Sequence, residues 1–199
     1  MDLIKKLSLE LVKKTFQKKG YKYFSNGYYN LNIFGIRNAN PETGLFDDLI
    51  CVSYSDSDGE KMHTYEGTTD SGAYYMENPI NKGKGAAILV PDQYLGAYKI
   101  GLHRGKQHAL VQLKPLRVYR DANRDKIMDF DPETIENGIF GINIHNSGIT
   151  DRIQVGKWSA GCQALRHPND WKIFMKLVDT AAKTYGNIFS YTLFNESDF

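Results

Sequence analysis

The sequence predicts an α+β fold that is mainly β, with a helix at the N-terminus and another near the C-terminus. Its 13 tyrosines and 10 phenylalanines are residues that favour strands. From residue 28 to about 146, short apolar or alternating runs are separated by turn signals such as Asn40-Pro41 and Asp58-Gly59. Apolar residues at helical spacing gather near the two ends of the chain. A length of 199 residues favours one main domain.

Residues 1–27 are expected to form an N-terminal amphipathic helix and its connector. A series of leucines at helical spacing predicts a helix over residues 2–19, which ends at Gly20. Lysine pairs occupy its polar side. This side is either simply exposed to solvent or weakly attracted to an anionic wall or membrane. We expect this helix to pack as an appendage on the main domain, residues 28–199.

The main domain is expected to consist largely of strands. They are predicted at residues 31–36, 48–54, 61–68, 86–91, 96–102, 109–112, 116–119 and 140–145. A helix is expected to begin near Pro168 and to run to about Lys183, because apolar residues recur there at helical spacing. A last strand, residues 187–194, closes the domain.

Charge and composition argue against several classes of function. A net charge of +2 gives no reason to expect nucleic acid as a partner. No apolar stretch approaches the roughly 18 residues of a membrane span, and the N-terminus lacks the features of a secretory signal. We therefore expect a protein made in the cytoplasm that reaches any outside target by another route. No histidine pair has the spacing of a zinc helix motif and no glycine-rich segment fits a nucleotide loop, so no cofactor is expected.

The two cysteines lie in different settings. Cys51 falls in an apolar run typical of a buried strand, where a thiol is an inert small hydrophobe. Cys162 follows a glycine in the polar turn Ser159-Ala160-Gly161-Cys162. A single pair allows one disulfide but gives no framework of them, so we expect both thiols to be reduced.

Cys162 has the surroundings of a nucleophile. A thiol with a pKa of about 8.5 is only a few per cent thiolate at neutral pH, so catalysis needs a base within hydrogen-bond reach. His145, at the end of a predicted strand, supplies an imidazole. The amides of Gly161 and Cys162 are candidates for holding an oxyanion, at about 3 to 4 kcal/mol per donor. Ser159 either hydrogen-bonds the turn itself or meets the substrate.

These residues resemble the signature of the L,D-transpeptidase (YkuD-like) family, in which a histidine on a strand precedes a Ser/Thr-x-Gly-Cys turn by a similar interval. Upstream, the run from Tyr94 to Ile100 is similar to a strand that those domains carry before the histidine. The resemblance spans residues 90–170 and implies a YkuD-like β-sandwich or barrel core. It also implies Cys162 as nucleophile, His145 as base, and peptidoglycan stem peptides that contain a D-centre as substrate.

Two positions depart from the family pattern. Ala160 stands where the family usually has a histidine, and Ala164 stands where it usually has an arginine that recognises a substrate carboxylate. The residues left to bind substrate are Arg166, Arg104, His103 and Trp158. Trp158, beside the turn, either lines the substrate groove or belongs to the core.

The segment over residues 99–105 and an aspartate-rich loop over residues 121–129 resemble proteins of phages and of gut Bacteroidetes. This is an analogy at the level of the fold. Without a secretory signal, this favours a lytic wall hydrolase, released by other means or part of a phage lytic system. Bacterial peptidoglycan is the expected partner. Two alternatives remain: a cross-linking L,D-transpeptidase, and a catalytically silent wall-binding or virion module that retains the fold.

The aspartate-rich loop offers a second kind of site. Asp121, Asn123, Asp125 and Asp129 place oxygen atoms at the spacing of calcium loops of the dockerin and EF-hand type. Lys126, however, occupies the position where such loops need a glycine. The alternative is a polar turn whose carboxylates cap backbone amides.

Overall fold

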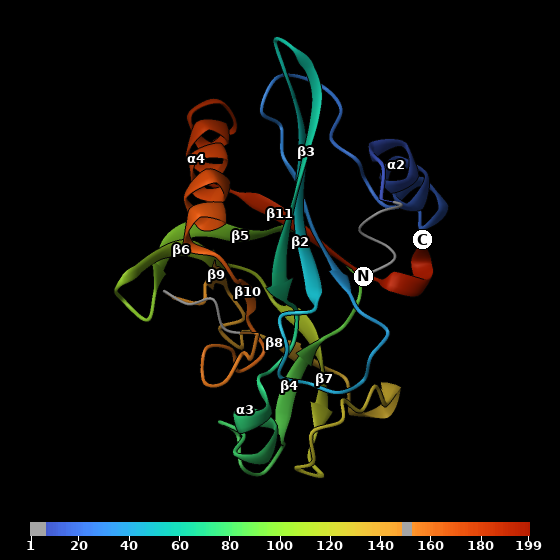
Figure 1. Ribbon diagram of the computed structural model, residues 1–199, viewed down its shortest axis with the longest axis vertical. Coiled ribbons are helices and arrows are strands. Elements are labelled where there is room, and N and C mark those ends of the chain that lie inside the picture. Colours follow the sequence, from blue (N-terminus) through green and yellow to red (C-terminus); the bar gives the residue numbers. More distant parts are fainter. Residues whose placement is uncertain (1–6, 149–152) are drawn as a thin grey trace.

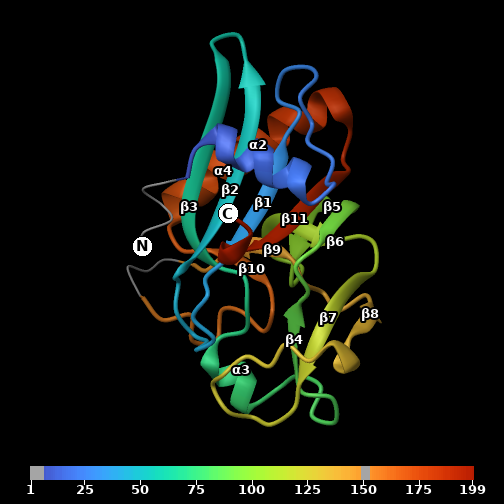
Figure 2. The same ribbon diagram turned by 90° about the vertical axis from the view of Figure 1, so that its right-hand side faces the viewer.

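A computed structural model describes residues 7–148 and 153–199, and within these ranges two sheets form the framework (Figures 1 and 2). Eight strands close a barrel, in the spatial order β1 (Asn32–Arg37), β11 (Phe189–Asn195), β5 (Gln93–His103), β6 (Gln107–Gln112), β9 (Ile144–Asn146), β10 (Gln163–Leu165), β3 (Gly59–Thr68) and β2 (Asp48–Asp56). The pairs β1–β11 and β9–β10 are parallel, and the other paired strands are antiparallel. The predicted class, α+β and mainly β, is confirmed.

A smaller sheet extends below the barrel in Figure 1. Its strands are β4 (Ala86–Leu89), β7 (Leu116–Asp121) and β8 (Glu136–Gly138). The helices are α2 (Leu9–Lys18), α3 (Ala73–Glu77) and α4 (Pro168–Tyr185), and two short 3-10 turns span Pro132–Thr134 and Glu196–Asp198. In the described ranges, no helix is long and apolar enough to cross a membrane.

The two longer helices pack on opposite sides of the barrel (Figures 1 and 2). The apolar face of α4, which includes Trp171 and Phe174, joins the main core inside the barrel. On the other side, Phe16 of α2 packs edge-on against Phe34 and Phe194, with ring centroids 5.8 and 5.0 Å apart. Because burying one such side chain contributes roughly 1.5–3 kcal/mol, α2 is anchored as the expected appendage.

The predicted helices are present with changed ends. Helix α2 begins only at Leu9, because the Ser8 hydroxyl caps it by accepting the Leu11 amide at 3.2 Å. Residues 2–6 of the predicted helix lie outside the described residues. The helix after the Cys162 turn begins at Pro168 as expected and continues to Tyr185.

The strand predicted at residues 140–145 is wrong over its first four positions, since β9 begins at Ile144. The amides of Phe140, Gly141 and Ile142 donate instead to one side-chain oxygen, Gln112 Oε1, at 3.0, 2.8 and 3.2 Å. A side chain thereby takes the hydrogen bonds that a neighbouring strand would have received. The resulting loop lies against the predicted nucleophile. Strands β8 and β10 and helix α3 were not predicted.

Candidate active site

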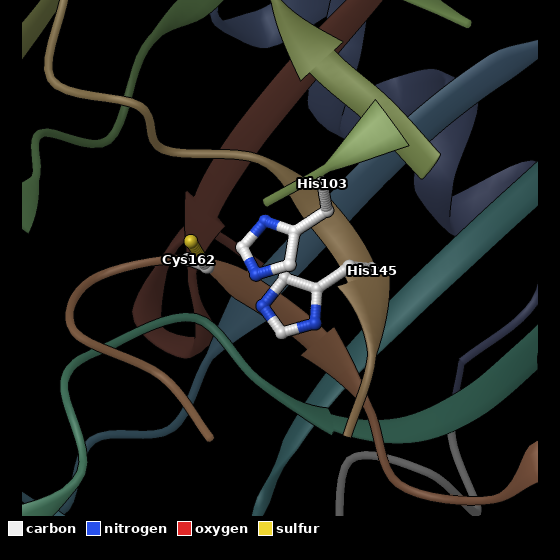
Figure 3. Close-up of side chains that lie close together, drawn as sticks. All are labelled: His103, His145 and Cys162. Atoms are coloured by element: carbon white, nitrogen blue, oxygen red, sulfur yellow. The ribbon is translucent and has the colours of Figure 1, made fainter. Parts of the chain in front are cut away.

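The barrel brings the predicted nucleophile and base together (Figure 3). His145 lies in β9, Cys162 immediately precedes β10, and these strands are parallel neighbours with His145 opposite Ala164. His103 ends β5 and lies beside them. The Cys162 sulfur and a ring nitrogen from each histidine all lie within 4.8 Å of one another. His103 is 42 positions from His145 and 59 from Cys162 in the chain, and the three side chains nevertheless form one cluster.

The Cys162 thiol is protected in this state. Cys162 is only 8% exposed, and its sulfur makes two contacts at 3.5 Å. The Asn143 amide donates to the sulfur, while the S–H donates to the carbonyl oxygen of Gly141. Burial raises the pKa of the Cys162 thiol, and the Asn143 amide opposes this in part. The resting group is therefore a neutral thiol at neutral pH.

His145 is held as a neutral base. Its Nδ1 donates to the carbonyl oxygen of Asn146 at 2.9 Å, and this hydrogen bond orients the ring. Its Nε2 is buried and has no hydrogen-bond partner among the described residues. Burial first, and then the nearby His103 ring, lower the pKa of His145 to about 4. At neutral pH the bare Nε2 is free to accept a proton.

His103 stacks on His145, with ring centroids 4.1 Å apart and 14° between their planes. Its Nδ1 lies 2.9 Å from the side-chain nitrogen of Asn143. Burial, assisted by Arg104, lowers the pKa of His103. The His103 ring is therefore neutral at neutral pH, so any substitution for the family arginine in binding a substrate carboxylate would be by hydrogen bonding. Arg104 is exposed in the β5–β6 turn, with φ of +51°.

Ser159 binds the backbone of the turn, which is the first of its two expected roles. It is fully buried, and its Oγ lies 2.8 Å from the Cys162 carbonyl oxygen and 2.6 Å from that of Asp70. The Gly161 amide donates to the same Oγ at 3.1 Å. The expectation that this amide faces an oxyanion is therefore wrong. Gly161 matters for its backbone instead, because φ is +115° and a Cβ there would lie 2.5 Å from the carbonyl oxygen of Ala87.

A network of buried polar side chains continues from the Cys162 turn through the next residue, Gln163. Gln163, the residue after the nucleophile, donates through Nε2 to Thr69 O at 3.2 Å and accepts from the Tyr191 hydroxyl at 2.8 Å. Arg37 also donates to Thr69 O, at 2.9 Å, and Asp48 accepts the Thr69 amide at 2.7 Å. These residues are fully or almost fully buried. The sequence offers no local signal for them, because they come from separate strands.

The sequence patterns also do not identify Asn143 and Gln112 as residues of the site. Asn143 contacts both the sulfur and His103, and its Oδ1 accepts the Gln112 amide at 2.9 Å. One signal was present: Asn143 stands two positions before His145, which places both on one face of an extended segment. For Gln112 the sequence gives no such indication.

A cavity of about 120 Å³ adjoins the turn at Ser159–Cys162. Ala160 and Phe140 line it, and these residues flank Gly161 and the Gly141 carbonyl that contacts the thiol. Arg120 also lines it, with its guanidinium 5.0 Å from the centre of the Phe140 ring. Ser71 is a further lining residue, and its buried Oγ has no partner within the described part of the chain. The cavity is therefore lined by the Arg120 cation and by Ala160 of the turn, whereas Cys162 is not among its lining residues.

The other two predicted substrate residues lie elsewhere. Trp158 is 40% exposed and packs over Gly148, where a Cβ would lie 2.5 Å from its ring. Arg166 forms an ion pair with Glu66 and lines a separate cavity of about 220 Å³. Cys162, His145 and His103 do not line that larger cavity. Arg166 is therefore not placed to stand in for the family arginine, which corrects that expectation.

Three side-chain oxygens of the aspartate-rich loop accept backbone amides, whereas the buried Asp121 Oδ1 has no partner in the described part of the chain. Asn123 accepts from the Asp125 amide at 3.1 Å, Asp125 from Ile127 at 2.8 Å, and Asp121 from Asp129 at 2.9 Å. Asn123 also donates to Asp129 Oδ2 at 2.8 Å. These contacts match the capped polar turn that was the alternative to calcium. Among the described residues, only His103, His145 and Cys162 form a three-residue group close enough to share a metal ion.

Comparison of the chain with protein-family models, with curated proteins and with solved structures finds no match in any of the three. What the protein does is therefore inferred from the residues around Cys162 and from the motif they form.

Proposed function

We propose that this protein is a cysteine-dependent acyl-transfer enzyme of the L,D-transpeptidase-like kind, acting on peptidoglycan stem peptides. One observation carries the proposal: the Cys162 sulfur and a ring nitrogen of His145 lie within 4.8 Å, and His145 Nε2 is otherwise unpartnered among the described residues. The resemblance of the Ser-x-Gly-Cys turn and its upstream histidine supplies the substrate class. A YkuD-like core is part of the same proposal.

The resting pair defines the chemistry. His145 Nε2 takes the thiol proton as the sulfur attacks a stem-peptide carbonyl carbon, and the Asn143 amide, 3.5 Å from the sulfur, stabilises the thiolate as it forms. The peptide C–N bond then breaks, and the leaving nitrogen takes the proton from His145. The acyl group remains on Cys162 as a thioester. Water, deprotonated by His145, hydrolyses the thioester and restores the thiol.

Hydrolysis is preferred to cross-linking. The resemblance of residues 99–105 and of the aspartate-rich loop to phage and gut Bacteroidetes proteins suits a lytic wall peptidase. If an amine from a second stem peptide resolved the thioester instead, the product would be a cross-link. Both outcomes pass through the same acyl-enzyme, so only the products separate them.

The test is digestion of purified peptidoglycan, followed by mass spectrometry of the soluble fragments. Wild type should release free stem fragments, and Cys162→Ala should lose on the order of 10³-fold or more of that activity. Cys51→Ala is the matched control, because Cys51 is buried in β2 away from the cluster. New dimers in place of free fragments would identify a cross-linking enzyme. Equal activity of wild type and Cys162→Ala would end the nucleophile proposal.

A second candidate is a wall-binding or virion module without catalysis. The burial of the Cys162 sulfur and the raised thiol pKa favour it. Such a module would bind walls, release nothing, and show no acyl adduct at Cys162 in intact-protein mass spectrometry. An adduct that hydroxylamine removes would exclude it.

A further inference from the structure

We propose that the two stacked histidines carry their ring protons on different nitrogens and so play opposite roles toward the substrate. His145 acts as the base, and His103 acts as a catalytic hydrogen-bond donor. His145 offers a bare Nε2, whereas His103 offers an Nε2–H to the substrate carbonyl oxygen as it becomes negative. This inference deepens the proposed function and rests on it. In Figure 3 the two rings lie one above the other, with the Cys162 sulfur to the same side of both.

The tautomer of His145 follows from its neighbour. The carbonyl oxygen of Asn146, 2.9 Å from Nδ1, accepts hydrogen bonds and cannot donate them. Nδ1 must therefore carry the proton. A neutral imidazole has one N–H, so Nε2 is left with its lone pair.

The tautomer of His103 follows from a second chain of contacts. The Gln112 backbone amide donates to Asn143 Oδ1 at 2.9 Å, which fixes the oxygen end of that side chain. The nitrogen end therefore faces His103 Nδ1, also at 2.9 Å. Because an amide nitrogen only donates, Nδ1 must be bare and the ring proton must sit on Nε2.

The same contacts keep His103 neutral. A second proton on the ring would point from Nδ1 at the Asn143 amide hydrogens. It would also place a cation 4.1 Å from the centre of the His145 ring, which must take up the thiol proton. His103 is therefore suited to donate a hydrogen bond without becoming an acid. A neutral donor aimed at developing charge is the kind of group that stabilises an oxyanion.

The site needs such a donor. The Gly161 amide is bound to Ser159 Oγ, and the Asn143 amide contacts the sulfur. The turn therefore supplies one oxyanion donor fewer than the sequence predicts. His103 comes from β5, on the far side of β6 from β9, and brings a ring nitrogen to the cluster from another direction.

A metal ion is the competing use of the same three side chains. Two histidines and a cysteine are a common zinc ligand set. A metal on His103 Nε2, however, would require the proton on Nδ1, where it would face the Asn143 amide hydrogens. Rotating that amide would break its bond from the Gln112 amide. The residues around the cluster thus fit a donor and not a ligand.

The tautomers can be read directly by ¹⁵N NMR of histidine-labelled protein, in the presence of a chelator. At pH 7, His145 should show a protonated Nδ1 and a bare Nε2, and His103 the reverse. In Asn143→Asp, the new carboxylate should draw the proton to His103 Nδ1 and raise the pKa of that ring. A protonated His103 Nδ1 in the wild type would overturn the inference, as would stoichiometric Co²⁺ binding with a thiolate charge-transfer band.

Kinetics supply the second readout. His103→Leu should slow thioester formation by about 10²-fold in kcat, with little change in KM. His103→Gln, which restores an N–H, should recover at least a third of that loss on a logarithmic scale. His108→Gln is the control, because His108 is half-exposed and pairs with Asp179. Full activity in His103→Leu overturns this inference alone, whereas inactivity of the wild type overturns the proposed function and this inference with it.

Discussion

The Ser159 hydroxyl lies 2.8 Å from the backbone carbonyl oxygen of Cys162, the residue three positions later. The same oxygen lies 2.6 Å from the carbonyl of Asp70 and accepts the Gly161 amide. One buried side chain therefore ties the backbone of the nucleophile to the segment that follows β3. The position of the sulfur therefore depends on the buried Ser159 side chain.

Ser159→Ala should both destabilise the protein and misplace the nucleophile. The substitution leaves the Gly161 amide and two buried carbonyl groups short of a partner, at a cost of about 1–3 kcal/mol in the free energy of unfolding. Urea denaturation and the rate of Cys162 acylation measure the two effects. Ser147→Ala is the matched control, because Ser147 is as buried and its hydroxyl binds the carbonyl of Arg166 at 3.0 Å. If both variants lost the same share of activity, Ser159 would have no special role in placing the thiol.

The pH dependence should report a neutral thiol–imidazole pair. Because burial raises the pKa of Cys162, alkylation by iodoacetamide should have its midpoint above that of a free cysteine measured alongside. The Cys51→Ala background makes the label report on Cys162 alone. Wall digestion needs neutral His145, so it should fall only as the pH drops through about 4. Alkylation with a midpoint well below pH 8 would instead indicate a preformed thiolate.

The sequence predicts the parts of this site that are local in the chain. Cys162 and its turn, His145 at a strand end, and the helix from Pro168 can each be recognised from a few neighbouring residues. The loop at residues 140–143 could not be predicted, because its amides bind a side chain 28 to 30 positions away.

The role of His103 could not be predicted from the sequence for the same reason. Its protonation depends on the orientation of Asn143, which the Gln112 amide fixes from a different strand. The sequence identifies His103 as a candidate substrate-binding residue but does not indicate its protonation state. Tertiary hydrogen bonds, which no local pattern encodes, decide which nitrogen carries the proton.

Arg120 should bind a substrate carboxylate in the cavity beside the turn. It pairs with Glu136 at 3.0 Å, and Glu136 also pairs with Lys84, so the three groups carry a net charge of +1. Arg120→Gln should raise KM about 10-fold for stem peptides with a free carboxylate and leave kcat unchanged. Steady-state kinetics on matched acid and amide peptides test this, with Arg166→Gln as control. An equal effect on both peptides would show that Arg120 does not recognise the carboxylate.

Asp70 should make the protein less stable as the pH rises. Its carboxyl is buried, and burial first, then the neighbouring Asp48, raise its pKa to about 8, although Arg37 opposes this. The folded state therefore holds a proton that the unfolded chain releases near pH 4. The stability that this proton confers is complete below about pH 4 and is lost as the pH rises through about 8.

Asp70→Asn isolates this effect, because an amide oxygen can still accept the Thr68 hydroxyl that lies 2.7 Å from Asp70 Oδ1. Relative to wild type, the variant should gain at least about 1 kcal/mol in the free energy of unfolding between pH 5 and pH 8.5. Urea denaturation at both pH values measures the difference. Asp48→Asn is the matched control: the Asp48 oxygens accept the amides of Asn38 and Thr69, so an NH₂ group there should destabilise the protein at both pH values. A parallel loss in the two variants would mean that Asp70 is ionised at neutral pH and accepts its hydrogen bonds as a carboxylate.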